Sequence, residues 1–419
     1  MTVLIAGGGI GGLAFGLSLH QVGVPFRIFE AVEELRPLGV GINLQPHAVR
    51  ELFELGLEDR LDEIGLRTKE VAYFSAHGRE IWREPRGLDA GYRWPQFSIH
   101  RGLLHMALLD AVRTRCGTDV VQTGVAVSDW TNLPDGVEVA LEDRKTGKSK
   151  GTTKGSVLIA ADGINSTARA KLYPEEDGAV WGGTMMWRGV TDGPAFLSDC
   201  TVAMSGKKDV KFVCYPIARN TEGVRINWIA DLTMPPDYDW RAQDWSREGA
   251  RTDFAQHFKD WSFDWLDIPE IIETAENVWE YPMVDREPLS QWTHGNMTLL
   301  GDAAHAMYPI GSNGASQCIL DARHLARALR DHGETQDALM AYEDVRRDSV
   351  NALVLANRGD GPDKILDEVA VRAPDGFGTI DEVMSAEELD SHARRYKAIA
   401  GMDIETLNAS ASILDDRAA

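Results

Sequence analysis

The chain has 419 residues, of which 43% are hydrophobic and 26% are charged, as in a folded globular protein large enough for two or three domains. It carries 43 Lys and Arg against 65 Asp and Glu, a formal net charge of −22, which excludes the extended basic surface that nucleic acids and anionic membranes require. An anionic small molecule is not excluded, because a helix N-terminus binds phosphate locally. Glycine is in surplus, with 40 residues against the usual ~7%, which predicts many tight turns or close backbone approaches.

Cysteine usage and the absence of targeting signals predict a cytoplasmic protein. Cys116, Cys200, Cys214 and Cys318 form neither a C-x-x-C pair nor a Cys/His ligand set, so a reducing compartment is expected and no metal site is predicted. A strand is predicted from Thr2 onward, which leaves no room for a signal peptide. No apolar run approaches the ~20 residues of a membrane span. We expect no membrane partner and either a monomer or a homodimer.

The first thirty residues predict a βαβ unit. The apolar run Thr2–Ala6 is typical of a buried parallel strand, a helical pattern follows through Leu13 and Val22, and Phe26–Glu30 predicts a second strand.

Strands and helices then alternate along the chain before a sheet-rich stretch begins. Further helices are predicted at Arg50–Leu57, Leu103–Cys116, Gly314–Asp331, Thr335–Asn357 and Met384–Ile399. Further strands are predicted at Gly65–Glu80, Val120–Val127, Val137–Leu141, Ser156–Ala160 and Met297–Gly301. Between Gly182 and Thr233, apolar segments broken by turns predict a second domain dominated by sheet.

Gly7, Gly9 and Gly12 form a G-x-G-x-x-G motif between the first strand and the first helix, and Glu30 ends the second strand. In such a motif the first glycine permits the tight turn, the second lets the backbone approach a pyrophosphate, and the third lets the helix pack on the sheet. The helix N-terminus supplies N–H donors to the phosphates, and Glu30 can accept hydrogen bonds from a ribose. The combination predicts an adenine dinucleotide site. By itself it leaves open whether the dinucleotide is a nicotinamide or FAD.

Two later motifs each end a strand with an acid and a glycine. Asp162 and Gly163 follow the strand that ends at Ala160, and Gly301 and Asp302 follow the strand at Met297, with Pro309 and a glycine-rich turn behind them. The three motifs together resemble those of the single-component, FAD-dependent aromatic hydroxylases with the para-hydroxybenzoate hydroxylase fold. Within that family, several segments are similar to those of phenazine-modifying monooxygenases: Arg36–Val49, Pro95–Gly102, Met186–Thr191, Tyr281–Leu289 and Gly301–Ala322.

The resemblance implies a bound FAD and assigns residues to it. It places Glu30 at the adenosine ribose, Arg101 on the FAD, and Asp302 at the ribityl or pyrophosphate region. Asp162 is associated with both flavin and nicotinamide handling, although a simple turn cap stays an open alternative because Asp-Gly is a common turn pair. The other implied FAD contacts are Gly7, Gly9, Ile10, Gly11, Gly12, Ala31, Leu38, Gly39, Val40, Gly41, Val125, Gly301, Gly311, Ser312, Asn313 and Gly314.

One segment departs from the family pattern. Ser312–Ser316 stands where many members have Gly-Gln-Gly-x-Asn, so the hydrogen bonds to the flavin ring are not predicted residue by residue. A helix beginning near Gly314 would still direct its positive end at the ring and stabilise anionic reduced flavin.

An aromatic hydroxylase also needs a dry apolar cavity beside the flavin. The candidate lining residues are Met186, Trp187, Tyr215, Trp228, Tyr281, Met283 and Pro309. Arg188 is the candidate partner for a substrate carboxylate or phenolate, with an interdomain salt bridge as the open alternative. No residue is predicted to act as a catalytic acid or base.

The predicted fold is α/β: a Rossmann-like, three-layer FAD-binding domain (1–75, 99–180 and 276–358), an inserted sheet-rich substrate domain (76–98 and 181–275) and a C-terminal helical segment (359–419). The resemblance implies hydroxylation of an aromatic or heteroaromatic small molecule, with or without loss of a carboxylate. FAD would be the bound cofactor, NAD(P)H the transient reductant, and a flavin C4a-hydroperoxide formed from O2 the oxygen donor. Two alternatives stay open: a flavin oxidoreductase that acts on a quinoid or unsaturated substrate without oxygen insertion, and a non-catalytic FAD-binding sensor.

Overall fold

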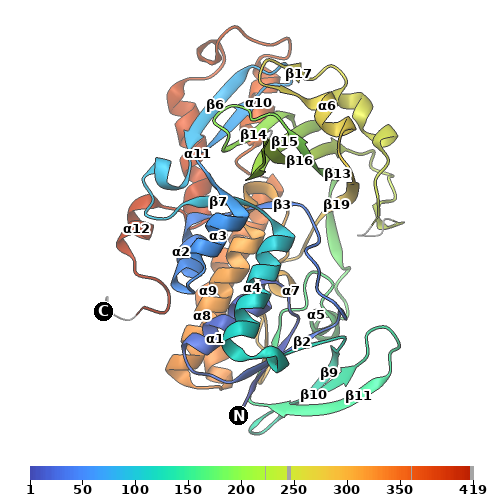
Figure 1. The fold of residues 1–419 in the computed structure, drawn as a ribbon, viewed down its shortest axis with the longest axis vertical. Helices are drawn as coiled ribbons and strands as arrows, with labels where there is room; N and C mark the ends of the chain where they lie inside the picture. Colours follow the sequence, from blue (N-terminus) through green and yellow to red (C-terminus); the bar gives the residue numbers. More distant parts are fainter. Residues whose placement is uncertain (222, 243–246, 360, 416–419) are drawn as a thin grey trace.

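The computed structural model describes residues 1–221, 223–242, 247–359 and 361–415. Two sheets of different kinds organise these residues, a parallel sheet in the lower half of Figure 1 and a larger mixed sheet in the upper half. The mixed α/β fold expected from the sequence is thereby confirmed.

The smaller of these sheets is parallel and has the strand order β20-β12-β1-β2-β8. Its strands are β1 (Val3–Ala6), β2 (Phe26–Glu30), β8 (Val121–Thr123), β12 (Leu158–Ala160) and β20 (Met297–Leu299). The strands β1, β12 and β20 are short and buried along their whole length, as is typical of parallel strands whose two faces are covered. Helix α1 (Ile10–Gln21) packs against α4 (Arg101–Cys116) and α8 (Gly314–His332), as Figure 1 shows.

The larger sheet has the order β19-β13-β16-β15-β14-β5-β6. Its strands are β5 (Glu70–Phe74), β6 (Glu80–Pro85), β13 (Ala179–Gly193), β14 (Thr201–Lys207), β15 (Val210–Arg219), β16 (Val224–Thr233) and β19 (Val278–Arg286). Strands β5 and β19 come from segments that we had assigned to the FAD-binding domain, so this sheet reaches beyond the expected boundaries. The division into domains stays a proposal with these two strands placed on the substrate side.

The remaining strands form three small sheets. They are β3 (Gly41–Leu44), β4 (Gly65–Thr68) and β7 (Gln96–His100) in one sheet, β9 (Ala126–Leu133), β10 (Gly136–Glu142) and β11 (Ser149–Gly155) in a second, and β17 (Ser262–Phe263) with β18 (Leu266–Asp267) in a third. The other helices are α2 (Pro46–Glu54), α3 (Glu58–Ile64), α5 (Thr167–Leu172), α6 (Ile268–Glu273), α7 (Asp302–His305), α9 (Gln336–Gly359), α10 (Lys364–Arg372), α11 (Ala386–Ile399) and α12 (Ile404–Ala409).

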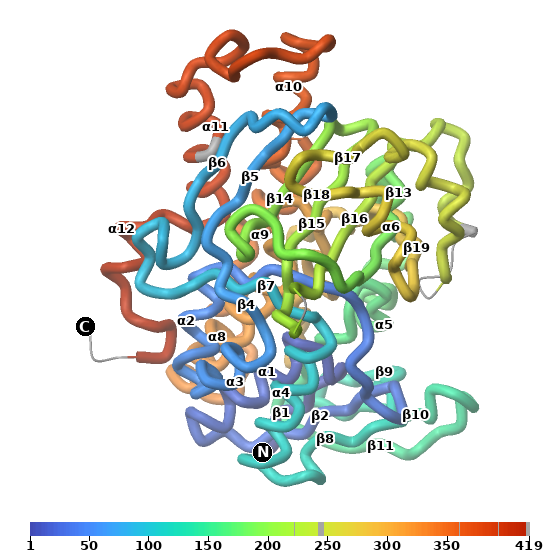
Figure 2. The backbone as a smooth tube through the Cα atoms, turned by 45° about the horizontal axis from the view of Figure 1, so that its top comes forward, coloured from blue at the N-terminus to red at the C-terminus, as the bar shows by residue number. Residues whose placement is uncertain are grey.

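The C-terminal helices run back over both halves of the molecule. Helix α10 packs on β14 of the large sheet, and α11 packs on α9 (Figure 2). The apolar side chains of Ile365 and Leu366 are buried there with Tyr73 of β5. The segment is therefore part of the wall of the upper half.

The expected elements differ from the observed ones at several boundaries. The helix predicted from Arg50 begins at Pro46, and the strand predicted at Val120–Val127 is divided into β8 and β9. Strand β11 was not predicted, and helices α10 and α12 lie within the expected C-terminal helical segment (359–419), for which bounds were predicted only at Met384–Ile399. In the part of the chain that is described, no helix is both long enough and apolar enough to cross a membrane.

Candidate active site

Residues of all three sequence motifs meet at one edge of the parallel sheet. Strands β1, β2, β12 and β20 run in the same direction, so their carboxyl ends place Gly7, Glu30, Asp162 and Gly301 side by side. In open α/β sheets this edge is where ligands bind. Residues far apart in the chain thus converge because parallel pairing aligns their strand ends.

The glycines at this edge are of two kinds: at some a side chain would collide with the backbone, and at others it would point into empty space. A Cβ on Gly12 would lie 2.1 Å from the Gly7 carbonyl oxygen, and one on Gly7, whose φ is +105°, would lie 2.3 Å from the Ala161 oxygen. By contrast, a Cβ on Gly9, Gly163 or Gly314 would meet no described heavy atom within 4 Å. The backbone is therefore bare where a flat phosphorylated cofactor would approach, which fits FAD.

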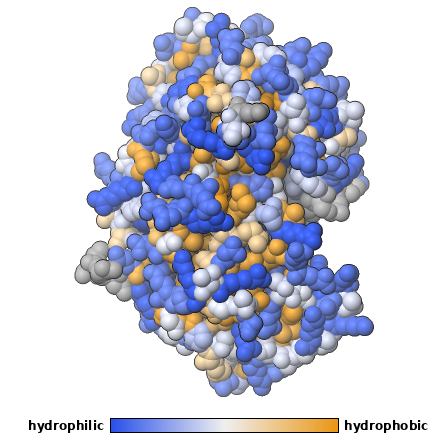
Figure 3. All heavy atoms as spheres, viewed as in Figure 1, coloured by the Kyte–Doolittle hydropathy of each residue, from blue (hydrophilic) through white to orange (hydrophobic). Residues whose placement is uncertain are grey.

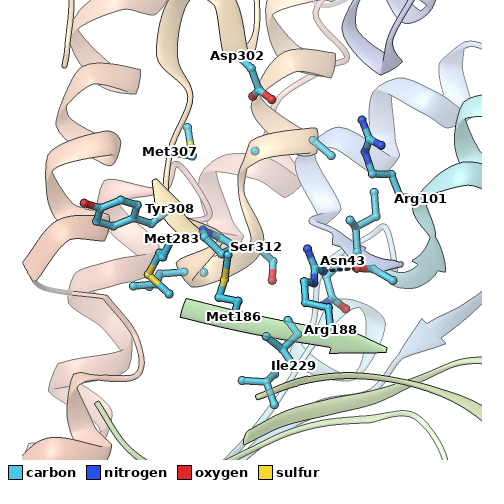
Figure 4. A pocket seen from close by; sticks show the side chains of 18 of the residues that line it. Asn43, Arg101, Met186, Arg188, Ile229, Met283, Asp302, Met307, Tyr308 and Ser312 are labelled. Atoms are coloured by element: carbon cyan, nitrogen blue, oxygen red, sulfur yellow. Dashed lines mark hydrogen bonds between the residues drawn. The ribbon is translucent and has the colours of Figure 1, made fainter. Parts of the chain in front are cut away.

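Two charged side chains flank this open space. Arg101 begins α4, and Asp302 begins α7 and is exposed. Figure 4 shows both at one end of the cavity, across from the large sheet. A guanidinium and a carboxylate in this arrangement can engage the phosphates and the hydroxyls of a dinucleotide, respectively.

Glu30 binds the backbone at the tip of the glycine-rich turn. Its Oε2 accepts a hydrogen bond from the N–H of Gly8 at 2.7 Å, and its Oε1 accepts one from Val32 at 2.8 Å. The carboxylate thus stabilises the conformation of the loop. The same carboxylate lies where the adenosine ribose is proposed to bind.

Asp162 acts on the start of α5. Its Oδ2 accepts hydrogen bonds from the N–H groups of Thr167 at 2.8 Å and Ala168 at 3.3 Å. Its Oδ1 is buried without a hydrogen-bond partner in the described structure, and burial raises the pKa of the carboxyl group. One carboxylate oxygen of Asp162 therefore caps the turn before α5. The other oxygen has no described partner, which supports the proposal that Asp162 also contacts the cofactor.

A cavity of about 370 Å³ extends from this edge to the large sheet (Figure 4). Of the predicted cofactor residues it is lined by Gly9, Ile10, Gly11, Gly41, Arg101, Gly301, Asp302, Gly311, Ser312 and Gly314. The predicted residues Gly7, Gly12, Glu30, Ala31, Leu38, Gly39, Val40, Val125, Asp162 and Asn313 lie outside its lining. Their roles toward the cofactor stay proposals.

On the sheet side, the Arg188 guanidinium lies beside an apolar part of the cavity wall. Met186, Met283 and Tyr308 form a buried cluster, against which Ile229 packs. Arg188 on β13 donates from Nη2 to the carbonyl oxygen of Gly41 at 2.9 Å. Its Nε is buried and has no hydrogen-bond partner among the described residues. An N–H donor left in this state favours a ligand acceptor.

Strand alternation corrects two of the expected lining residues. Met186 and Arg188 face the cavity, so Trp187 between them points to the opposite face, where it stacks on Phe254. Trp228 likewise faces away from the cavity and stacks on Phe212. Both indoles belong to the buried core behind the sheet. They do not line the substrate cavity, because consecutive residues of a strand point to opposite faces.

The other expected lining residues lie in or beside the cavity. Tyr215, Met283 and Pro309 line it, while Tyr281 packs beside its apolar cluster. Burial raises the pKa of Tyr215 to about 12, against the opposing effect of the Arg188 charge. Burial also raises the pKa of Tyr281. Both phenols are therefore protonated at neutral pH and can donate hydrogen bonds.

Several cavity residues were not predicted from the sequence. They are Ile42, Asn43, Val202, Met204, Lys211, Val213, Ile229, Asp231, Met307, Tyr308, Ile310, Pro362 and Asp363. Lys211 in the apolar strand β15 and Asp231 in the apolar strand β16 were the available signals, since a charge in such a strand needs a partner or a ligand. Asp363 carried no signal, because it reaches the site from the C-terminal segment.

The loop at the end of the cavity is braced from that same segment. Tyr396 of α11 accepts a hydrogen bond at its Oη from Asn313 Nδ2 at 2.8 Å and donates to Asn357 Oδ1 at 2.9 Å. A Cβ on Gly311 would collide with the Tyr396 ring. Gly311 also has a φ of +72°, which favours glycine. The turn geometry and the nearby Tyr396 ring therefore both require a residue without a Cβ.

Known proteins are similar to this chain, in sequence and in fold, over most of its length. Residues 1–357 match the family model described as FAD binding domain. Phenazine 1,6-dicarboxylic acid hydroxylase PhzS of Lysobacter antibioticus is 44% identical over 367 residues, 85% of this chain and 89% of that protein. Aurachin C monooxygenase/isomerase of Stigmatella aurantiaca is 33% identical over 84% of this chain and 87% of that protein.

The fold likeness extends to solved structures. The crystal structure of Klebsiella pneumoniae HpxO complexed with FAD and uric acid has a TM-score of 0.74 to this chain at 23% identity, covering 97% of this chain and 96% of that one. This likeness shows the common fold.

Proposed function

This chain belongs to the FAD-binding domain family and is an FAD-dependent hydroxylase of aromatic compounds, and from that premise we propose that its substrate is a planar heteroaromatic carboxylate of the phenazine class. The relative with 44% identity supports this class, since it is named as a hydroxylase of a phenazine dicarboxylic acid.

The observation that carries the proposal is the Arg188 side chain, which lines the cavity beside the apolar cluster of Met186 and Met283. Its Nη2 is bound to Gly41, while its buried Nε has no described partner. A substrate carboxylate would satisfy that donor, and the apolar, polarisable thioether side chains of Met186 and Met283 would pack on aromatic rings. Charge and shape together therefore favour an aromatic acid over a neutral aliphatic compound.

FAD, when bound and reduced by NAD(P)H, supplies an oxygen atom from O2 in a form that an electron-rich ring accepts. Arg188 orients the ring by its carboxylate, and the apolar side chains of Met186, Met283 and Ile229 exclude water from the reacting edge. Helix α8 begins at Gly314 in the cavity wall, so its N-terminal N–H groups would stabilise negative charge on the cofactor ring. The chain thereby orients the substrate, excludes water from the reacting edge and stabilises negative charge on the cofactor.

The test is turnover of phenazine-1-carboxylate under labelled O2. The FAD-loaded protein should oxidise NAD(P)H faster when the compound is present, and the product should carry one labelled oxygen atom. NAD(P)H oxidation without label in any product would instead indicate an oxidoreductase. A flavin that NAD(P)H does not bleach with any aromatic acid would indicate a non-catalytic protein.

A further inference from the structure

One amide NH2 group in the cavity has no acceptor among the described residues. Asn43 of β3 lines the cavity, although only 4% of the residue is exposed. Its Oδ1 accepts a hydrogen bond from the Ser98 hydroxyl at 2.7 Å, while no described residue accepts one from its Nδ2. Buried side-chain donors in folded proteins are normally satisfied, so this NH2 group favours a ligand that carries an acceptor.

The neighbouring strands fix the orientation of this amide. Asn43 and Ser98 are paired across β3 and β7, so their side chains lie on the same face of the sheet. On β4 the Thr68 hydroxyl lies 2.8 Å from the Ser98 hydroxyl, and all three side chains are buried. Because Ser98 binds the carbonyl oxygen of the amide, the NH2 group is the part that is left for the cavity. A donor held in this way loses little entropy when it binds an acceptor.

Asn43 also lies close to the arginine that is proposed to bind the substrate carboxylate. Arg188 donates from Nη2 to the carbonyl oxygen of Gly41, which is two positions before Asn43 on the same strand. Residues two apart on a strand share a face, and their Cα atoms are about 7 Å apart. Both side chains line the same cavity (Figure 4). A flat molecule whose carboxylate is held by Arg188 therefore presents the atoms next to that carboxylate to Asn43.

The amide of Asn43 differs in kind from the guanidinium of Arg188. It is uncharged, so it distinguishes an acceptor from a non-acceptor rather than an anion from a neutral group. A pyridine-type ring nitrogen is a neutral acceptor whose lone pair lies in the plane of the ring. A ring C–H in its place would direct a hydrogen at the NH2 group and leave the donor unsatisfied, which weakens binding.

We propose that Asn43 determines specificity by recognising a ring nitrogen of the substrate. Its Nδ2 donates to the nitrogen that is peri to the carboxylate held by Arg188. Ser98 is a positioning residue, which holds the carbonyl oxygen of the amide. Aromatic acids with nitrogen at that position are then preferred to those with a C–H there. This inference rests on the proposed function, of which it specifies how the heteroatom is recognised.

The test compares two planar acids that differ at a single ring position. Phenazine-1-carboxylate has a nitrogen peri to the carboxylate, whereas acridine-1-carboxylate has a C–H there and keeps the remote nitrogen. Binding to the FAD-loaded protein is followed by the ligand-induced change in flavin absorbance, without reductant and at mildly alkaline pH, where both carboxylates are ionised and neither ring is protonated. The wild-type protein should bind phenazine-1-carboxylate about tenfold more tightly, the value of one satisfied hydrogen bond.

Four variants examine the source of this preference. Asn43→Asp keeps the size of the side chain and the acceptor for Ser98 but has no N–H, so the preference should disappear. Asn43→Leu should likewise bind the two acids equally. Ser98→Ala frees the amide to rotate and should reduce the preference, and an unchanged preference would show that Ser98 does not position the amide. Asn132→Leu removes an exposed amide on β9, outside the cavity lining, and should keep the preference.

The ratio of the two dissociation constants separates recognition from structural support, because a general loss of stability weakens the binding of both acids alike. Equal binding of both acids to the wild type, or an unchanged ratio in Asn43→Asp and Asn43→Leu, overturns this inference alone. A lower FAD affinity in Asn43→Leu with an unchanged ratio also overturns it, since the acceptor would then be on the cofactor. If neither acid binds, the proposed function fails and this inference fails with it.

Discussion

Arg188 donates a hydrogen bond to the carbonyl oxygen of Gly41, at 2.9 Å, and so links the large sheet to the three-stranded sheet of β3, β4 and β7. On the other side of the same residue, the Gly41 N–H donates to Asn227 Oδ1 at 2.6 Å. A Cβ at position 41 would lie 2.6 Å from the Asn227 Cβ, so only glycine fits between these partners. The strand beside the expected cofactor ring is thus held by two side chains of the substrate sheet.

Replacement of Arg188 by Met should weaken the binding of substrate and leave the binding of FAD unchanged. The loss of a charge-assisted hydrogen bond should raise the dissociation constant of an aromatic carboxylate about 10- to 100-fold. Arg225→Met on the neighbouring strand removes an exposed arginine and should leave that constant unchanged. Titration of the flavin absorbance with the ligand measures both, and an unaltered affinity in Arg188→Met would contradict the assignment.

Gly9→Ala and Gly12→Ala should affect different properties, FAD affinity in the first variant and stability in the second. The Cβ of Gly9→Ala points into open space, so the thermal stability of the apoprotein should be unchanged while FAD affinity falls at least about tenfold, because the methyl group occupies the approach of the pyrophosphate. The Cβ of Gly12→Ala would overlap the Gly7 oxygen and should destabilise the apoprotein by about 1–3 kcal/mol. Thermal melts and FAD titrations of both variants check this, and wild-type FAD affinity in Gly9→Ala would show that no phosphate lies there.

Asp302→Ala should lose most of its FAD and keep its fold. The side chain is exposed at the start of α7, so its removal leaves no cavity in the core. FAD affinity should fall about tenfold or more if the carboxylate accepts hydrogen bonds from the cofactor. The flavin-to-protein ratio after gel filtration reports the result, with the exposed Asp375→Ala as the matched control. A stoichiometric flavin content in Asp302→Ala would refute the assignment.

Buried His47 should make the protein sensitive to mild acid. Burial, together with the nearby charge of Arg346, lowers the pKa of His47 from 6.5 to about 3. Between these values the unfolded chain binds a proton that the folded chain does not, so stability is complete above pH 6.5 and is lost as the pH falls. At pH 5 this group should cost about 2 kcal/mol of unfolding free energy.

The measurement is urea unfolding with saturating FAD at pH 7 and pH 5. His47→Gln should show a smaller loss of stability between the two pH values than the wild type, because its side chain does not titrate. His332→Gln, a change at an exposed position, should behave as the wild type does. Equal losses in His47→Gln and wild type would show that His47 does not carry the effect.

Local patterns predicted the cofactor half of the fold well. The apolar strand at Val3–Ala6, the glycines and Glu30 act within one short stretch, so their geometry follows from backbone chemistry. Strand β11 was missed because Ser149–Gly155 has no apolar alternation and exists by pairing with β10. The start of α2 was missed although Pro46 at its first turn is a known start signal.

The substrate half of the site was predicted less completely, for two physical reasons. Trp187 and Arg188 were expected to share a cavity, although adjacent strand residues face opposite sides of a sheet. The link from Lys211 to Asp363 spans 152 positions of the chain, and no periodicity in either segment reports it. Such contacts arise from tertiary packing and become visible only in the folded chain.

The family match ends at residue 357, yet Asp363 and Tyr396 reach the site from beyond it. The far wall of the site is therefore supplied in part by a segment that lies outside the family match. A chimera that exchanges residues 361–415 between two relatives should change the shape and charge of this wall, which the affinity for substrate reports, while the residues proposed to hold FAD stay those of the recipient.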